Sequence, residues 1–343
     1  MKGVLGWDIG GVNTKAARVA GTRVVAMRAV PYEIQRDPAA LAPLLARVAG
    51  ELGGTPADAH AVTMTAELSQ IFRTKRDGVA FVVDAVTRAF SDGLVRVYAV
   101  DGRWLTADEA RREPLAIAAA NWAAAARLVA RSFPNCILID VGSTTTDIIP
   151  IAGGAPAALG RTDPERLREE ELVYTGALRT PAEAIAAHVP LGGRSTGVSA
   201  EGFALAGDVH LWRRQLAPSD YTVPTPDGRA ATRELAGERL ARVVCGDREI
   251  LDEAAIDAIA EALWDAQVTR ITEAVGRVRR RHPGLGLAVV TGLGDFLAAE
   301  AARRAALRVT HLSAALGPAA RHAPAAAAAL LLAAELAAEP VTS

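Results

Sequence analysis

The sequence is poor in cysteine, in aromatic residues and in long apolar runs, and each scarcity excludes a class of protein. Its two cysteines, Cys136 and Cys245, lie far apart in a chain of 343 residues, which excludes a zinc-knuckle spacing and argues against a disulfide framework. Aromatic residues make up 4% of the chain, too few and too scattered to form a stacking platform for bases. No apolar run reaches the roughly 20 residues that a bilayer-spanning helix needs. We therefore expect a soluble, cytoplasmic protein.

An excess of charge of one sign is also missing. Thirty-eight basic and 39 acidic side chains leave a net charge of -1, so no overall field attracts the protein to nucleic acid or to anionic lipid. We expect small-molecule substrates and neither a nucleic-acid nor a membrane partner, and a bound anion must be held by a local site. The sequence leaves the oligomeric state open, and a homo-oligomer remains an option.

Lysine is scarce as well, since Lys2, Lys15 and Lys75 are the only lysines among the 38 basic residues. A GC-rich genome explains a preference for arginine wherever any cation serves. Lysine carries a compact point charge, whereas arginine carries a planar fork. A lysine in this arginine-rich chain is therefore there either by chance or because its position needs a compact ammonium. Lys2 is terminal and uninformative, which leaves Lys15 and Lys75 as the candidates.

Two stretches of the chain share one sequence pattern. Val4 to Ile9 is an apolar segment that predicts a strand, and it is followed by a glycine turn and a returning strand. Cys136 to Val141 is a second such strand with the same sequel. Each strand holds an aspartate near its end, Asp8 or Asp140, 132 residues apart. The repeat predicts two similar halves, which we place at 1–134 and 135–343, with irregular inserted loops over about 160–228.

The turns that follow these strands suit a phosphate group. Glycine lets the backbone N-H groups approach an anion without an intervening side chain, and an aspartate at a strand end can hold Mg2+. A third strand, Leu287 to Val290, leads into a further glycine turn with Gly292 and Gly294 and then into a helix. The plain alternative is that Asp8 and Asp140 only cap turns, but two matched copies and a strand-Gly-x-Gly-helix element in this order favour a binding role.

This arrangement resembles the superfamily of actin, sugar kinases and DnaK-type chaperones. Within it the chain resembles the hydantoinase A/oxoprolinase family, in particular the short single-chain members associated with tetrahydromethanopterin-linked one-carbon metabolism. The segments that carry the resemblance are GWDIGGVNTK, VTMTAELSQIFRTKRDGVAFVVDAV, VYAVDGRWLTADEARREPLAIAAANW, ILIDVGSTTTDIIPI and VVTGLGDFLA. The resemblance implies an α/β protein of the actin-like ATPase (ribonuclease H-like) fold, duplicated into two halves around a cleft.

The resemblance also implies an activity, in the biosynthesis of a methanofuran-type cofactor. The implied enzyme is a transferase that joins (5-aminomethylfuran-3-yl)methyl diphosphate to γ-glutamyltyramine, with the phenol oxygen displacing diphosphate. An ATP-dependent small-molecule kinase or a hydantoinase/oxoprolinase-type hydrolase would use the same turns for ATP, and both remain alternatives. A nucleotide-dependent switch like actin would need self-association surfaces, of which the alanine-rich helices give no clear sign.

The implied chemistry assigns roles to particular residues. The phosphate-binding candidates are Gly10, Gly11, Asn13, Thr14, Lys15, Gly142, Ser143, Thr144, Thr145, Gly292 and Gly294. Asp8, Asp140, Asp147 and Lys15 are the catalytic candidates, with Asp8 and Asp140 as ligands of Mg2+; Thr65, Glu67 and Lys75 are possible substrate-binding residues. The phenol needs a base or a neighbouring cation to become a nucleophile, and Asp147, Glu67, Asp84 and Lys75 are all open as that group. Glu67 has the plain alternative of only starting a helix.

Overall fold

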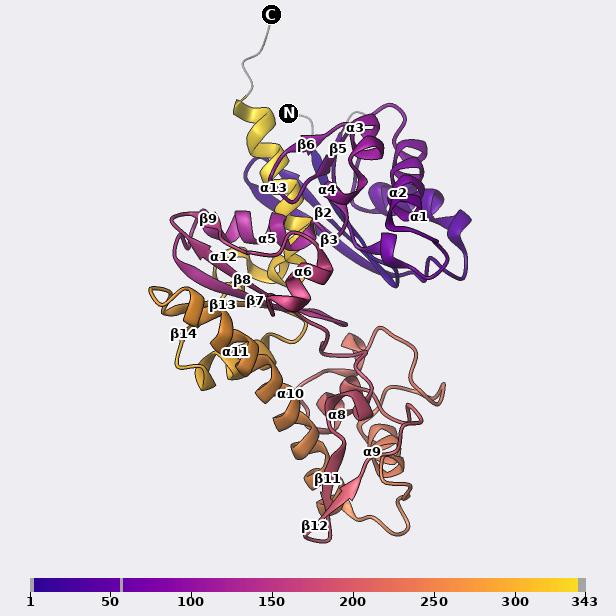
Figure 1. The fold of residues 1–343 in the computed structure, drawn as a ribbon. Coiled ribbons are helices and arrows are strands. Elements are labelled where there is room, and N and C mark those ends of the chain that lie inside the picture. Colours follow the sequence, from indigo (N-terminus) through magenta and orange to yellow (C-terminus); the bar gives the residue numbers. More distant parts are fainter. Residues whose placement is uncertain (1–2, 56–57, 339–343) are drawn as a thin grey trace, which may run out of the picture. The chain divides into compact units, whose positions relative to one another are not determined.

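The computed structural model describes residues 3–55 and 58–338, which divide into two compact units (Figure 1). The first unit contains the chain up to Cys136 together with 151–166 and the segment from Leu312 onward, and the second contains 137–150 and 167–311. The predicted halves, 1–134 and 135–343, differ from these units because the chain returns to the first unit twice. The last return is explained by the packing of the C-terminal helix.

The first unit is built on a six-stranded sheet. Its strands are β1 (Val4–Ile9), β2 (Asn13–Ala20), β3 (Arg23–Pro31), β4 (Ala59–Met64), β5 (Leu94–Tyr98) and β6 (Trp104–Leu105), in the order β3-β2-β1-β4-β5-β6. β4 runs parallel to β1 and to β5, whereas β2 returns antiparallel to β1. The carboxyl ends of β1 and β4 therefore lie side by side at one edge of the sheet, next to the turn between β1 and β2.

Helices cover both faces of this sheet, and successive side chains of β1 point to opposite faces. Leu5, Trp7 and Ile9 pack in one core with the apolar faces of α1 (Leu41–Glu51) and α2 (Lys75–Ala89). Val4 faces the other way, toward α13 (Ala323–Ala338). A Cβ on Gly6 would come within 2.0 Å of the Ala325 carbonyl oxygen. The alanine-rich helix thus lies directly on the strand, which is why the end of the chain belongs to the first unit.

The alanine content of the stretch 114–133 favours a single helix, but the stretch is broken in the structure. It forms α4 (Pro114–Ile117) and α5 (Asn121–Ala130), with Ala119 between them at a positive φ of 51°. Ala118 makes a parallel bridge to Met64 at the end of β4. The chain therefore leaves the helical path to extend the edge of the sheet, a tertiary effect that helix propensity does not report.

The remaining short elements of this unit are η1 (Pro38–Ala40), η2 (Ala66–Leu68), α3 (Ala107–Arg112), β9 (Ala155–Pro156), α6 (Asp163–Arg168), α12 (Ser313–Leu316) and η4 (Gly317–His322).

The second unit repeats the strand order of the first. Its strands are β7 (Cys136–Val141), β8 (Thr146–Ala152), β10 (Leu172–Val173), β13 (Leu287–Gly292) and β14 (Arg308–His311), in the order β10-β8-β7-β13-β14, with β9 paired to β8. A hairpin again lies on one side of the first strand, and two parallel strands continue on the other. The recurrence of one strand order in two α/β units confirms the predicted duplicated actin-like fold. The cleft expected with it stays a prediction.

Two long helices pack on the sheet of the second unit. α10 (Glu253–Arg281) and α11 (Asp295–Arg304) bury an apolar face against β7 and β13, with Ile139, Val268 and Val275 in the shared core. α10 begins at Asp252, whose side chain accepts a hydrogen bond from the Ala255 amide, the usual way to satisfy a free N-H at a helix start. Within the described ranges, no helix is long and apolar enough to cross a bilayer.

The segment 160–228, predicted as irregular loops, is more ordered than expected. It contains α6, β10, α7 (Ala182–Ile185), the hairpin of β11 (His188–Leu191) and β12 (Arg194–Gly197), α8 (Ala206–Trp212) and η3 (Pro218–Asp220). Arg166 and Glu171 belong to a stretch of mixed charge, which is typical of an exposed helix, but both are buried. The guanidinium of Arg166 lies 4.3 Å from the ring centroid of Trp122. Stacking of this kind allows an arginine to be buried, and a charge pattern alone does not reveal it.

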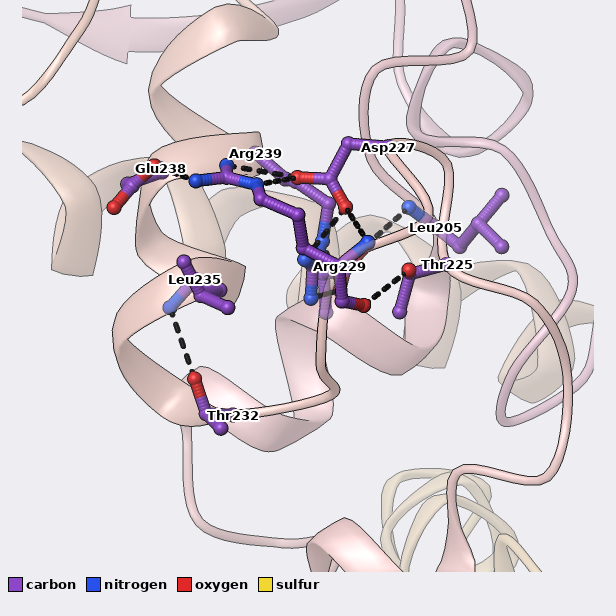
Figure 2. A network of polar contacts seen from close by, with 9 residues as sticks. Leu205, Thr225, Asp227, Arg229, Thr232, Leu235, Glu238 and Arg239 are labelled. Atoms are coloured by element: carbon purple, nitrogen blue, oxygen red, sulfur yellow. Dashed lines mark hydrogen bonds and ion pairs between the residues drawn. The ribbon is translucent and has the colours of Figure 1, made fainter.

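A buried ion-pair network fixes part of this region in the second unit (Figure 2). Arg239 on α9 (Arg233–Arg242) is fully buried, and its guanidinium lies 2.7 Å from Asp208 and 3.2 Å from Asp227. Asp227 also pairs with Arg229, which in turn contacts Glu238. Burial raises the pKa of Asp208, and the neighbouring Arg239 opposes that effect. The network ties the chain around residue 227 to α8 and α9, a structural role.

Candidate functional site

The two predicted phosphate turns have the same backbone geometry, each within its own unit. In the first, the Gly10 N-H donates a hydrogen bond of 3.0 Å to the Asn13 carbonyl; in the second, the Gly142 N-H donates one of 2.9 Å to the Thr145 carbonyl. We call 10–13 turn 1 and 142–145 turn 2. The residues between, including Gly11, Ser143 and Thr144, form the tips of the turns. The sequence repeat is thus a repeat of structure, whereas the binding of phosphate by these residues stays a prediction.

Turn 1 carries its own cation. Asp8 and Lys15 are direct partners across β1 and β2, and the Lys15 Nζ lies 3.5 Å from the Asp8 Oδ2. Strand alternation therefore points Lys15 toward Asp8, which the sequence left open. His322 lies near Lys15: its pKa falls to about 4, chiefly because of burial and secondly because of the Lys15 charge. Thr14 is buried, and its Oγ1 has no hydrogen-bond partner in the described part of the chain.

The end of β4 brings Thr65 to turn 1. The Thr65 N-H donates a 2.9 Å hydrogen bond to the carbonyl of Ile9, the last residue of β1. A Cβ on Gly10 would lie 3.4 Å from the Thr65 Oγ1, so the hydroxyl is next to the turn. Two residues earlier, in β4, the Thr63 Oγ1 donates a hydrogen bond of 2.9 Å to the Trp7 carbonyl. The predicted candidate Thr65 therefore adjoins the first phosphate turn.

Glu67, Lys75 and Asp163 form a cluster of charges in the same unit. The Lys75 Nζ lies 2.6 Å from the Asp163 Oδ2 and 4.0 Å from the Glu67 Oε1. Glu67 is 2% exposed, and neither of its carboxylate oxygens has a hydrogen-bond partner among the described residues. Burial raises the pKa of Glu67 to about 7, while Lys75 and nearby backbone amides act against it. Sequence reasoning missed Asp163, because it is 88 positions from Lys75 and follows no motif.

Turn 2 lies against the third glycine turn, within the second unit. The Gly294 N-H donates a 2.9 Å hydrogen bond to the Val141 carbonyl. Gly292 has a positive φ of 93°, and a Cβ there would come within 2.4 Å of the Asp140 Oδ1. The Asp140 carboxylate thus rests against backbone that only glycine allows. Asp147 lies on the returning strand β8, in register with Leu172 of β10.

A buried polar chain supports turn 2, and no motif in the sequence indicates it. The Thr146 Oγ1 donates to the Thr175 carbonyl at 2.7 Å, and the Gln267 Nε2 donates to the Thr175 Oγ1 at 2.8 Å. His210 completes the chain with a 3.1 Å contact to the Gln267 Oε1. Burial lowers the pKa of His210 to about 4, so the ring is neutral near pH 7. Low local polarity strengthens such a network when all its members are paired.

The residues present fit a magnesium ion only in part. Among the described residues, no group of three or more His, Cys, Asp or Glu side chains is close enough to hold a metal. Mg2+ commonly binds through one or two carboxylates, with water and substrate phosphates as its other ligands. Asp8 faces the Lys15 ammonium, and Asp140 rests against Gly292, so each turn brings one carboxylate of this kind. A metal at Asp140 would depend on a bound phosphate for completion.

Comparison with known proteins agrees with these features. The family model described as "Hydantoinase/oxoprolinase" matches residues 58–335. The chain belongs to the hydantoinase/oxoprolinase family. The Methanocaldococcus jannaschii protein named (4-{4-[2-(γ-L-glutamylamino)ethyl]phenoxymethyl}furan-2-yl)methanamine synthase is 36% identical over 299 residues, covering 87% of this chain and 88% of that protein. A Methanococcus vannielii protein of the same name is 39% identical over 167 residues, covering 49% of this chain and 74% of that protein. Among solved structures, an inorganic polyphosphate/ATP-glucomannokinase from Arthrobacter is 14% identical with a TM-score of 0.49, covering 98% of this chain and 100% of that one.

In this hydantoinase/oxoprolinase family member, one of the four candidate bases is already occupied by a strong partner. Asp84 on α2 accepts two hydrogen bonds from the Arg111 guanidinium, at 3.0 Å and 2.7 Å. Two hydrogen bonds from one guanidinium hold the carboxylate in a fixed orientation toward Arg111. Asp147, Glu67 and Lys75 remain as candidates.

Proposed function

We propose that this protein is the transferase that joins (5-aminomethylfuran-3-yl)methyl diphosphate to γ-glutamyltyramine. The observation that carries the proposal is the 36% identity, over nearly the whole of both chains, to a relative whose name describes an aryl ether of a γ-glutamylaminoethyl phenol and a furfuryl amine. An ether of this kind forms when the phenol oxygen attacks the furfuryl carbon and a leaving group departs. The turns described above suit the departure of a diphosphate.

Loss of diphosphate develops negative charge on the leaving group, so the enzyme needs donors that are already in place for it. At the tip of turn 1, Gly11 has no side chain to keep an anion away from its backbone, and a Cβ there would meet nothing within 4 Å. Lys15 lies directly across the hairpin from Asp8, where its ammonium can act as a point charge on a phosphate oxygen. Within the second unit, turn 2 with Asp140 and Gly292 is the part that we assign to Mg2+, which neutralises the charge of a phosphate group when it is bound.

The direct test incubates the purified protein with the furfuryl diphosphate, γ-glutamyltyramine and Mg2+. We expect diphosphate release and an ether product, followed by mass spectrometry, both dependent on the acceptor. Diphosphate release without ether formation, or no reaction at all, would contradict the proposal. Phosphate release from ATP alone would instead support the kinase or hydrolase alternative, in which Gly292 and Gly294 contact adenosine.

A further inference from the structure

We propose that Glu67 is the general base that removes the phenolic proton of the acceptor, and that Lys75, positioned by Asp163, stabilises the phenolate as it forms. This inference rests on the proposed function and assigns the acceptor subsite to the cluster of Glu67, Lys75 and Asp163. It chooses among bases that the sequence left open, and it adds Asp163 as a positioning residue.

The first argument is the isolation of the Glu67 carboxylate. Glu67 lies in η2, directly after β4 and two residues beyond Thr65, which adjoins turn 1. Its oxygens are buried and make no hydrogen bond of standard geometry in the described ranges. The nearby donors are the backbone N-H groups of Glu67 itself and of Ala119, and the Lys75 ammonium is 4.0 Å away. Native proteins rarely leave a buried polar group in this state, because the desolvation cost is not repaid. A bound hydroxyl group would supply the missing hydrogen bond.

The second argument is the position of Lys75. It is the first residue of α2, whose start is fixed by a capping box in which the Thr74 hydroxyl and the Asp77 carboxylate each accept the other's backbone N-H. A cation at a helix N-terminus opposes the helix dipole, so Lys75 is not there for helix stability. Asp163 holds its ammonium at 2.6 Å. The ammonium thereby stays near Glu67 with 23% of the side chain exposed.

The third argument is the apolar surface on the same segments. Eight large hydrophobic side chains are exposed in the described chain, and four of them, Leu68, Ile71, Leu115 and Leu159, belong to this region. Leu68 is in η2, Ile71 lies between η2 and α2, Leu115 is in α4, and Leu159 precedes α6. Both η2 and α4 contact α2. Exposed apolar groups beside a few polar ones are typical of a site for an aromatic ligand, and a phenol combines both features.

The electrostatics suit a base that works near neutral pH. Lys75 on α2 and Asp163 on α6 are the charged groups that act on Glu67, with opposite effects, and burial outweighs both. Its pKa of about 7 makes the carboxylate the major form above pH 7. A base is most effective when its pKa lies near the working pH.

The step balances without any other reactant. The phenolic proton passes to the Glu67 carboxylate while an oxygen lone pair forms the bond to the furfuryl CH2 carbon. The bond from that carbon to the diphosphate oxygen breaks, and its electron pair leaves with the diphosphate. Glu67 is then neutral and returns its proton to water.

The experiment compares wild type with Glu67→Gln on acceptors of graded acidity, namely γ-glutamyltyramine and its ring-fluorinated analogues. With the parent acceptor we expect a loss of about a hundredfold in kcat, within the range for removal of a general base. The loss should shrink toward a few-fold as the phenol becomes acidic enough to ionise by itself. The wild-type kcat/KM should fall below about pH 7 because Glu67 becomes protonated, and Glu67→Gln should lack that limb.

Two further variants separate a chemical role from a structural one. Asp163→Asn should reduce kcat and keep the acidic limb of the pH profile, because it frees the Lys75 ammonium and leaves the base. Glu113→Gln is the matched control, since Glu113 is an exposed carboxylate paired with Arg103, and its kinetics should equal those of wild type. Circular dichroism and thermal melts check that each variant is folded.

The outcomes separate the two proposals. If wild type forms no ether, the proposed function and this inference both fail. If wild type is active but Glu67→Gln is as active, or loses the same factor on every acceptor, the transferase stands and the assignment of Glu67 as base is overturned.

Discussion

The motifs that contain turn 1 and turn 2 differ in the charge of their last residue. Asp8 to Lys15 and Asp140 to Asp147 have the same length and the same turn hydrogen bond, but the eighth residue is a lysine in the first and an aspartate in the second. In turn 1 that lysine faces the aspartate of the preceding strand, so the site has a cation of its own. The second motif has two acids and no basic residue among its eight positions. We infer that duplicated turns diverged into an ammonium site and a metal site.

The two turns also differ in their support. Turn 2 is held from behind: the amides of Ala177 and Leu178 donate to the carbonyls of Gly142 and Ser143, and a Cβ on Gly176 would come within 2.6 Å of the Thr144 backbone. Turn 1 has a simpler frame, in which Ile34 and Tyr32 donate to its carbonyls. A rigid cradle suits a metal ion that demands fixed geometry, whereas a flexible lysine tolerates more motion.

The largest expected effect comes from the two aspartates. Asp8→Asn and Asp140→Asn should each remain folded and lose about a hundredfold or more in rate, or about 3 to 4 kcal/mol of transition-state stabilisation. The comparison predicts a difference in magnesium dependence: Asp140→Asn should raise the Mg2+ concentration for half-maximal rate, and Asp8→Asn should leave it unchanged. Rates measured across a Mg2+ titration test both statements.

Near-normal turnover of both variants at saturating Mg2+ would show that these side chains only cap turns. An equal shift of the Mg2+ requirement in both variants would remove the distinction between an ammonium site and a metal site.

The next largest effect should follow a methyl group added to glycine. Gly292→Ala places a side chain at a φ of 93° and within 2.4 Å of Asp140, so we expect a loss of about 3 kcal/mol in the free energy of unfolding. Gly11→Ala in turn 1 is the matched change, since a Cβ there meets nothing within 4 Å, and its effect should stay within about 0.5 kcal/mol. Urea unfolding measures both, and equal stabilities would contradict the rigid frame assigned to turn 2.

A smaller effect should come from the polar chain behind turn 2. Gln267→Leu removes three hydrogen bonds, to His210, to the Thr175 hydroxyl and to the Gly176 carbonyl. The last two groups keep their contacts with the Thr180 hydroxyl, and we expect a cost of about 2 kcal/mol in the free energy of unfolding. Thr63→Val, which removes one hydrogen bond near turn 1, should cost about 1 kcal/mol. Thermal melts of the two variants show which turn depends more on its buried polar contacts. A larger loss of stability for Thr63→Val than for Gln267→Leu would contradict the stronger support assigned to turn 2.

The sequence was sufficient for the fold and for the turns because both depend on local patterns. An apolar strand, an aspartate and a glycine turn lie within eight consecutive residues, so their repetition is visible without a structure. The pairing of turn 2 with Gly292 and Gly294 also followed from the order of motifs.

What the sequence could not predict depends on contacts between distant segments. Asp163 reaches Lys75 across 88 positions, and the break at Ala119 follows from a bridge to Met64. The C-terminal helix joins the first unit because it packs on Gly6. Hydrophobic periodicity states that a helix has an apolar face, but not which sheet that face covers.

The smallest effect, and the finest test of the comparison, concerns the lysines. If turn 1 needs a compact ammonium beside Asp8, Lys15→Arg should reduce kcat/KM about tenfold, equivalent to about 1.4 kcal/mol, even though the charge is kept. The wider guanidinium does not fit a single oxygen in a turn lined by glycine.

Lys75→Arg should also be impaired, because a planar fork would bind Asp163 in a different geometry. Lys2→Arg, outside the described residues, is the control and should equal wild type. Diphosphate release in the presence of γ-glutamyltyramine measures all three, and if Lys15→Arg and Lys75→Arg both match the control, lysine persisted at these positions by chance and turn 1 requires only a positive charge.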